Sequence, residues 1–425
     1  MFKCLNVYMN FMSKGDILVG IDIGTSVIRT IVSQRKNDEE KPLILGVGEA
    51  VSAGINNGVI VDVEETVNVI TKSKEEAERI SGVPVEHAYI SINGSHIYSQ
   101  FSKGVVAVSR ADGEISEEDV GRVINAAQAI SMPNNKEIID IIPCSYMIDG
   151  QDQIKDPVGM NGVRLEVNAL VVEGMAPFIK NLMKCVQRCG IDIDDLVFAP
   201  LVAAKSVLQK RQKELGVVVV DIGKGTTGIS VFEDGNILYS SVIPIGAGHI
   251  TNDIAIGLRT SIDVAEKIKL EYGVALSKDV NKKDKINISE IDENEEGVFS
   301  RQYVAEIIEA RLEEIFSMVD KELQKIDKSG MLPAGVVVTG GGAKMSGIVP
   351  MAKEALKLPA QIGFPTELNG VVDRINDPSF ATAVGLIMWE SDENGAFSSG
   401  GGRFKIPSFS GIGQKVRKIF KTFLP

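Results

Sequence analysis

A repeated turn constrains the fold of this 425-residue chain more than any other feature. The first copy, at Val19–Ser26, reads Val-Gly-Ile-Asp-Ile-Gly-Thr-Ser, and the second, at Val218–Gly228, reads Val-Val-Val-Asp-Ile-Gly-Lys-Gly-Thr-Thr-Gly. In each copy an apolar strand leads into Asp-Ile-Gly, small polar residues follow, and a second strand begins. The aspartates of the two copies, Asp22 and Asp221, are 199 residues apart. The pattern therefore predicts two related half-folds in an α/β protein.

The chemistry of these turns suits phosphate. Glycine permits positive φ and lets backbone N–H groups approach phosphate oxygens closely, and the neighbouring hydroxyls add donors. An aspartate at a strand end can hold Mg²⁺, commonly through water. One such turn is also typical of an ordinary hairpin, but two matching turns favour a phosphate and Mg²⁺ site. The candidate residues are Asp22, Gly24, Thr25, Ser26, Arg29, Asp221, Gly223, Lys224, Gly225, Thr226 and Thr227, with Asp22 and Asp221 as the Mg²⁺ ligands.

A third glycine-rich segment, Val336–Met345, reads as a buried strand running into three glycines that open a helix. Such glycines permit close packing of a planar base and ribose, for which Gly340, Gly341, Gly342 and Met345 are the candidates. Glu266 and Lys269, three residues apart, lie on one face of a predicted helix and could hydrogen-bond adenine and ribose. A surface ion pair is the alternative for these two residues. The sequence has no Walker loop, and no G-x-G-x-x-G follows the first strand.

Charge divides the chain into an acidic body and a basic tail. The whole chain carries −12, and residues 394–425 contain six basic and no acidic residues, which leaves −18 for residues 1–393. An acidic body disfavours general nucleic-acid binding, whereas the tail suits an anionic surface. Four cysteines fit a reducing compartment. We expect residues 1–13 to be a disordered or mis-annotated start, with translation beginning at Met12.

The tail has the pattern of a membrane-surface helix. Between Gln414 and Leu424 the apolar residues recur at spacings 0, 3, 4, 7 and 8, and cations occupy the rest. A lone eleven-residue helix is marginal in water and needs a surface on which to fold. Nucleic acid is the weaker alternative partner, because phenylalanines on one face suit lipid better. The predicted membrane-contacting residues are Val416, Arg417, Lys418, Ile419, Phe420, Lys421, Phe423 and Leu424.

Together with the run Asp-Pro-Ser-Phe-Ala-Thr-Ala-Val-Gly at Asp377–Gly385, these motifs resemble the actin-like ATPase superfamily and, within it, the FtsA family of bacterial division proteins. The resemblance implies a duplicated, ribonuclease H-like fold of two lobes with ATP and Mg²⁺ in the cleft between them. It also implies a peripheral protein on the cytoplasmic face of the membrane at the division site. There it would tether FtsZ filaments, support Z-ring assembly and self-associate into filaments, with later division proteins as further partners.

The resemblance also implies a division of the chain. The first-lobe core would comprise residues 14–93 and 166–200 around an α/β insert at 94–165. The second-lobe core would comprise 201–240 and 305–364 around a small subdomain at 241–304. Residues 365–391 would return to the first lobe, 392–412 would form a flexible linker, and 413–425 the membrane helix. The C-terminal peptide of FtsZ is expected in the small subdomain near Arg301 and Lys285, although plain solvated charge is the favoured interpretation of Lys285.

Two other functions within the superfamily stay open at this point, a small-molecule kinase and a chaperone-type ATPase. A kinase needs a catalytic base in the cleft and has no use for an amphipathic tail, and a chaperone needs a further peptide-binding domain. Related chaperones place a glutamate before a proline at the crossover between lobes, where Ala199 precedes Pro200 in this chain. We therefore predict weak or no ATP hydrolysis and assign no catalytic residue.

Overall fold

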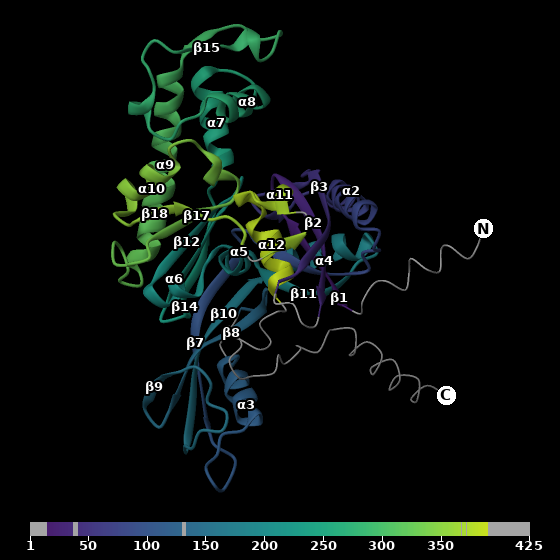
Figure 1. Ribbon diagram of the computed structural model, residues 1–425, viewed down its shortest axis with the longest axis vertical. Coiled ribbons are helices and arrows are strands. Elements are labelled where there is room, and N and C mark those ends of the chain that lie inside the picture. Colours follow the sequence, from purple (N-terminus) through teal and green to yellow (C-terminus); the bar gives the residue numbers. More distant parts are fainter. Residues whose placement is uncertain (1–14, 37–40, 130–132, 367, 371, 390–425) are drawn as a thin grey trace, which may run out of the picture.

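Two sheets built on the same plan form the core of the computed structural model (Figure 1), which describes residues 15–36, 41–129, 133–366, 368–370 and 372–389. The first has the order β11-β6-β1-β2-β3-β19 and the second β14-β13-β12-β17-β18. The strands of the first sheet are β1 (Gly15–Ile23), β2 (Val27–Lys36), β3 (Leu43–Val51), β6 (His87–Ile92), β11 (Asp192–Phe198) and β19 (Asn369–Gly370). Those of the second are β12 (Val217–Ile222), β13 (Thr227–Glu233), β14 (Asn236–Ile243), β17 (Val336–Thr339) and β18 (Ala360–Ile362).

The duplication read from the sequence is present in the strand pairing. In each sheet three consecutive strands form an antiparallel meander, and the first of them also pairs in parallel with a later strand. The four residues Val217–Val220 are buried because both faces of their sheet are covered. The prediction of two related half-folds in an α/β protein is thus confirmed.

Two helices, α5 (Ala199–Val207) and α12 (Ala381–Trp389), pack against each other between the sheets. A Cβ on Gly385 would lie 1.9 Å from the carbonyl oxygen of Val202, so only glycine allows this approach of the two backbones. Because α12 also packs on β1 and α5 on β12 and β13, this helix pair joins the two lobes.

Other helices cover the outer faces of the sheets. On the first lobe these are α2 (Val63–Ser81) and α4 (Ala176–Arg188). The Asp62 side chain accepts a hydrogen bond from the backbone N–H of Glu65 at the start of α2, and the helix ends at Gly82 with φ 70°. The second lobe carries α6 (Lys210–Leu215), α9 (Arg301–Gln324) and α10 (Ile348–Leu356).

A separate four-stranded sheet lies at one end of the long axis (Figure 1). It consists of β7 (Ile97–Ala107), β8 (Lys136–Ile148), β9 (Gln151–Ile154) and β10 (Arg164–Met175), with α3 (Glu117–Ala127) packed on it. The Ser116 and Asp119 side chains form a capping box at the start of α3. Ser99 of β7 donates a hydrogen bond to the Ser240 carbonyl of β14, so this sheet also touches the second lobe.

The opposite end of the long axis carries α7 (Ala247–Leu258), α8 (Ile262–Tyr272) and the hairpin of β15 (Lys285–Asn287) and β16 (Val298–Ser300) (Figure 1). The short elements are β4 (Ile55–Asn56), β5 (Val59–Ile60), α11 (Val372–Ile375) and the 3-10 turns η1 (Ser277–Asp279), η2 (Ile288–Glu290), η3 (Gly341–Lys344) and η4 (Pro378–Phe380).

The expected N-terminal extension at 1–13 and the expected linker and membrane helix at 392–425 lie outside the described residues. The boundaries assigned to the other segments stay predictions. Among the described helices, none combines the length and apolar character that crossing a bilayer requires.

Candidate nucleotide-binding cleft

The two predicted aspartates come from different lobes and lie within electrostatic reach of each other. Asp22 is the penultimate residue of strand β1, and Asp221 is the penultimate residue of strand β12. Burial, and then the like charge of Asp22, raise the pKa of Asp221 to about 7. Burial also raises the pKa of Asp22, against the lowering effects of Arg29 and Ser91. Two desolvated carboxylates within electrostatic reach of each other make a site that a divalent cation would stabilise, because its charge would offset their mutual repulsion.

Hydroxyl groups from neighbouring elements orient both carboxylates. Ser91 Oγ, at the end of β6, donates to Asp22 Oδ1 at 2.8 Å and accepts from the Ile23 N–H at 3.0 Å. Thr382 Oγ1, in α12, donates to Asp221 Oδ2 at 3.3 Å. Neither hydroxyl was among the predicted site residues. Ser91 stands at the end of an ordinary apolar strand, and only the parallel pairing of β6 with β1 brings it to Asp22.

The turns themselves meet the β4–β5 hairpin of the first lobe. The Gly58 N–H donates to Thr25 Oγ1 at 3.1 Å, and Asn93 Nδ2 donates to Thr226 Oγ1 at 3.3 Å. A Cβ on Gly225 would lie 2.6 Å from Asn57 Oδ1, so the second turn packs directly against this hairpin. The structure thus brings both predicted turns to one place between the lobes.

The third glycine-rich segment lies beside Asp221. Gly340 has φ 81°, and a Cβ there would lie 2.2 Å from Asp221 Oδ1, whereas a Cβ on Gly341 would meet nothing within 4 Å. One expectation was wrong in detail, because these glycines open only the short turn η3. The helix α10 begins at Ile348, after Gly347 has turned the chain with a positive φ of 81°.

Glu266 and Lys269 form a partly buried pair rather than a solvated surface pair. Lys269, 8% exposed, lies with its Nζ 2.6 Å from Glu266 Oε2 and donates to Thr251 Oγ1 at 2.9 Å. The charge of Lys224 acts on both groups, so the pair lies near the second turn. Met345 lies near Gly273, the residue after the end of α8. A Cβ added to Gly273 would lie 3.1 Å from the Met345 sulfur. The second-lobe candidates therefore gather around one region.

Arg29 lies near the two aspartates, where contacts with three other side chains hold it. Its Nε lies 3.1 Å from Glu49 Oε2, its Nη2 donates to Ser379 Oγ at 3.1 Å, and its guanidinium stacks on the Phe380 ring. With these contacts Arg29 holds a fixed position from which its charge lowers the pKa of Asp22 and of Asp221.

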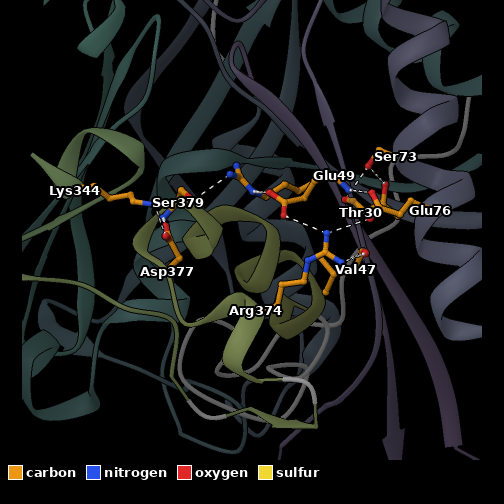
Figure 2. Close-up of polar contacts among 11 residues, drawn as sticks. Thr30, Val47, Glu49, Ser73, Glu76, Lys344, Arg374, Asp377 and Ser379 are labelled. Carbon is orange, nitrogen blue, oxygen red and sulfur yellow. Dashed lines mark hydrogen bonds and ion pairs between the residues drawn. The ribbon is translucent and has the colours of Figure 1, made fainter. Parts of the chain in front are cut away.

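Through Glu49 and Ser379, Arg29 joins a longer polar network, whose members Glu49, Arg374, Asp377 and Ser379 are labelled in Figure 2. Lys344 of η3 pairs with Asp377 at 2.6 Å, and Arg374 pairs with Glu76 of α2 at 3.1 Å and with Glu49 at 3.7 Å. The network links the third glycine segment to the outer helix of the first lobe. Sequence reasoning missed this network because its members are distant in the chain, and the motifs that contain some of them do not indicate which residues pair.

The two cations expected to meet a peptide lie at the far end of the second lobe. Lys285 is exposed on β15 and pairs in register with Ser300, the residue before Arg301. Arg301 Nε donates to the Tyr272 carbonyl at 3.0 Å, and its Nη1 lies 3.6 Å from Asp284. The structure places the two residues side by side, with Arg301 partly committed to contacts within the chain.

Two duplicated lobes whose glycine-rich turns meet between them define the actin-like class of proteins. Among solved structures, a PilM-PilN type IV pilus biogenesis complex chain has the same fold, with a TM-score of 0.66 at 15% identity over 88% of this chain and 98% of that one. MreB5 of Spiroplasma citri bound to ADP has a TM-score of 0.52 at 14% identity, over 88% of this chain and 96% of that one.

The family model for cell division protein FtsA matches residues 218–385, and that for the SHS2 domain inserted in FtsA matches residues 94–173. Cell division protein FtsA of Bacillus subtilis is 40% identical over 378 residues, which cover 89% of this chain and 84% of that protein. The chain therefore belongs to the FtsA family of cell division proteins, as its motifs predicted.

Proposed function

We propose that this protein binds ATP with Mg²⁺ and tethers FtsZ filaments to the cytoplasmic face of the membrane during cell division. One observation carries the nucleotide part of the proposal. Asp22 and Asp221 approach each other from duplicated turns, both with raised pKa values, beside a glycine segment with open space at Gly341. Kinase and chaperone functions lose support, because the similarity to an FtsA protein extends over 89% of the chain.

The residues present fit a magnesium nucleotide. Asp22 and Asp221 would hold the cation, largely through water, and the two Asp-Ile-Gly turns would face the phosphates. Glu266, Lys269, Met345 and the three glycines of Gly340–Gly342 would surround the adenosine. The ADP complex of MreB5, which has the same fold, supports a nucleotide as the ligand.

Replacing Asp221 by alanine is expected to weaken the binding of MgATP at least tenfold. The substitution removes one of the two carboxylates that face the cation and leaves Thr382 Oγ1 without its acceptor. Isothermal titration calorimetry measures the affinity, and Asp152→Ala, at an exposed site in the four-stranded sheet, is the matched control. An unchanged affinity would exclude Asp221 from the site.

Turnover of the bound nucleotide is expected to be slow. Ala199 and Pro200 form the first turn of α5 between the lobes, and no carboxylate stands at position 199 to orient a water. A phosphate-release assay that gave about 1–100 s⁻¹, the range of efficient kinases, would contradict this part of the proposal.

Replacing Arg301 by glutamine is expected to weaken the binding of an acidic FtsZ C-terminal peptide about fivefold, because a charged donor contributes more than a neutral one. Glutamine can still donate to the Tyr272 carbonyl, which keeps the local fold. The same change at Lys285 is expected to have a smaller effect, since Lys285 is exposed on β15. Fluorescence anisotropy with labelled peptide measures the affinities of both variants, and Lys103→Gln, on β7, is the control. Equal affinities for Arg301→Gln and the control would remove Arg301 from the binding face.

Self-association would use the two ends of the molecule. Exposed apolar side chains stand beside the four-stranded sheet at one end, including Val163 just before β10, and on α8 at the other, including Leu270. Contacts between unlike ends of successive copies generate open filaments. High-speed pelleting with MgATP tests this, and a protein that stays monomeric at all concentrations would argue against filaments.

A further inference from the structure

A groove of about 350 Å³ runs between α7 and α9, away from the nucleotide cleft. Its apolar lining comes from Ile256 and Gly257 on α7 and from Tyr303, Ile307 and Ala310 on α9. Ile256 is 77% exposed and Tyr303 43% exposed, so the groove presents large apolar side chains to solvent. The nucleotide proposal makes no use of it.

Acidic side chains line and flank the groove. Asp253 and Glu314 line it and share one cation, Arg311, which pairs with both. Glu306 and Glu313 are exposed on α9, with Ala310 of the lining between them at helical spacing. An occupant with an apolar face and flanking cations is therefore favoured over an acidic one.

The chain itself contains a segment with this chemistry. Val416, Ile419, Phe420 and Phe423 recur at the spacing by which a helix fills an apolar groove, and Lys415, Arg417, Lys418 and Lys421 flank them. The lengths also match. Tyr303 to Glu314 covers about 16 Å of helix axis, and Gln414 to Leu424 would cover about 15 Å.

The connection is long enough to reach. The last described residue is Trp389, and the 24 residues between it and Gln414 can extend to about 80 Å. A compact body of this size has a radius of gyration of about 20 Å. The basic segment can therefore reach any face of its own molecule.

We propose that the α7–α9 groove binds residues 414–424 of the same chain, so that the groove and an anionic membrane compete for one apolar face. The docked tail covers Ile256 and Tyr303, and the acidic rim pairs with its cations. A protein away from the membrane then keeps its phenylalanines out of water. The membrane half of this competition rests on the proposed function, whereas docking in the groove is tested without lipid.

Tryptic cleavage of the full-length protein without lipid measures docking. Lys415, Arg417, Lys418 and Lys421 lie within the docked segment, and Arg403 and Lys405 precede it as internal references. In the Ile256→Lys variant, cleavage within the segment relative to the references is expected to rise at least threefold, because a cation replaces an apolar contact. Glu314→Lys is expected to act in the same direction by reversing a charge of the rim.

Leu270→Lys is the matched control, since Leu270 is 73% exposed on the neighbouring helix α8 and does not line the groove. Its cleavage ratio is expected to equal that of the unmodified protein. Equal ratios in all four proteins would overturn the proposal, as would protection that appears only at high protein concentration, which indicates a second copy as the occupant. Because no lipid is present, a failed membrane assignment leaves this measurement interpretable.

Discussion

Replacing Gly340 by alanine is expected to lower the free energy of unfolding by about 2–4 kcal/mol and to abolish MgATP binding. Gly340 has φ 81°, which strains any residue with a Cβ, and that Cβ would lie 2.2 Å from Asp221 Oδ1 and 2.7 Å from the Ile222 carbonyl. The second Asp-Ile-Gly turn and the third glycine-rich segment cannot then keep their present contact. Urea denaturation measures the stability loss, and calorimetry measures nucleotide binding.

The neighbouring glycine provides the matched comparison. A Cβ on Gly341 would meet nothing within 4 Å, so Gly341→Ala is expected to leave stability within about 0.5 kcal/mol of the unmodified protein. It is nevertheless expected to weaken ATP binding a few-fold, since the open space is where the base and ribose would pack. If Gly341→Ala left both quantities unchanged, the adenosine would have to lie elsewhere. If Gly340→Ala were as stable as the unmodified protein, the close packing against Asp221 would be wrong.

Replacing Phe420 by glutamate is expected to reduce binding to anionic liposomes by at least tenfold. Full burial of one large apolar side chain contributes about 1.5–3 kcal/mol, which the substitution removes while placing a negative charge on the inserted face. The acidic body, with −18 over residues 1–393, gives no compensating attraction. Co-sedimentation with vesicles of anionic and neutral lipid measures the loss.

Two further variants separate the electrostatic part from the apolar part. Lys418→Glu is expected to weaken binding to anionic vesicles more than to neutral ones, and salt is expected to reduce that difference by screening. Deletion of residues 413–425 is expected to leave a protein that still binds the FtsZ peptide. A truncated protein that pelleted with anionic liposomes as well as the full chain would refute the anchor.

The sequence by itself predicted the duplicated lobes and the parts of the cleft. Local geometry is the reason, because a turn between two apolar strands, with glycine and aspartate at fixed positions, has few ways to fold. The repeat of Asp-Ile-Gly at Asp22 and Asp221 therefore predicted two equivalent sheets, and the strand orders agree. The basic tail was likewise predicted from the sequence alone. Its net charge and the helical spacing of its apolar residues can be recognised without knowing which other residues it contacts.

Only the tertiary structure decided which side chains surround those aspartates and what lies away from them. Ser91 and Thr382 reach the carboxylates because strand pairing and the α5–α12 packing bring them there. Ser91 belongs to no motif, and the Asp377–Gly385 run that contains Thr382 does not indicate its partner. Arg29 was predicted to bind nucleotide. In the structure its guanidinium donates hydrogen bonds to Glu49 and Ser379, which are 20 and 350 residues away in sequence. The α7–α9 groove has the same origin, since Ile256 and Tyr303 each read as ordinary helix residues until the two helices pack. Desolvation and charge pairing depend on distances between groups in space. Those distances cannot be inferred from a short stretch of sequence, because the groups concerned are far apart along the chain.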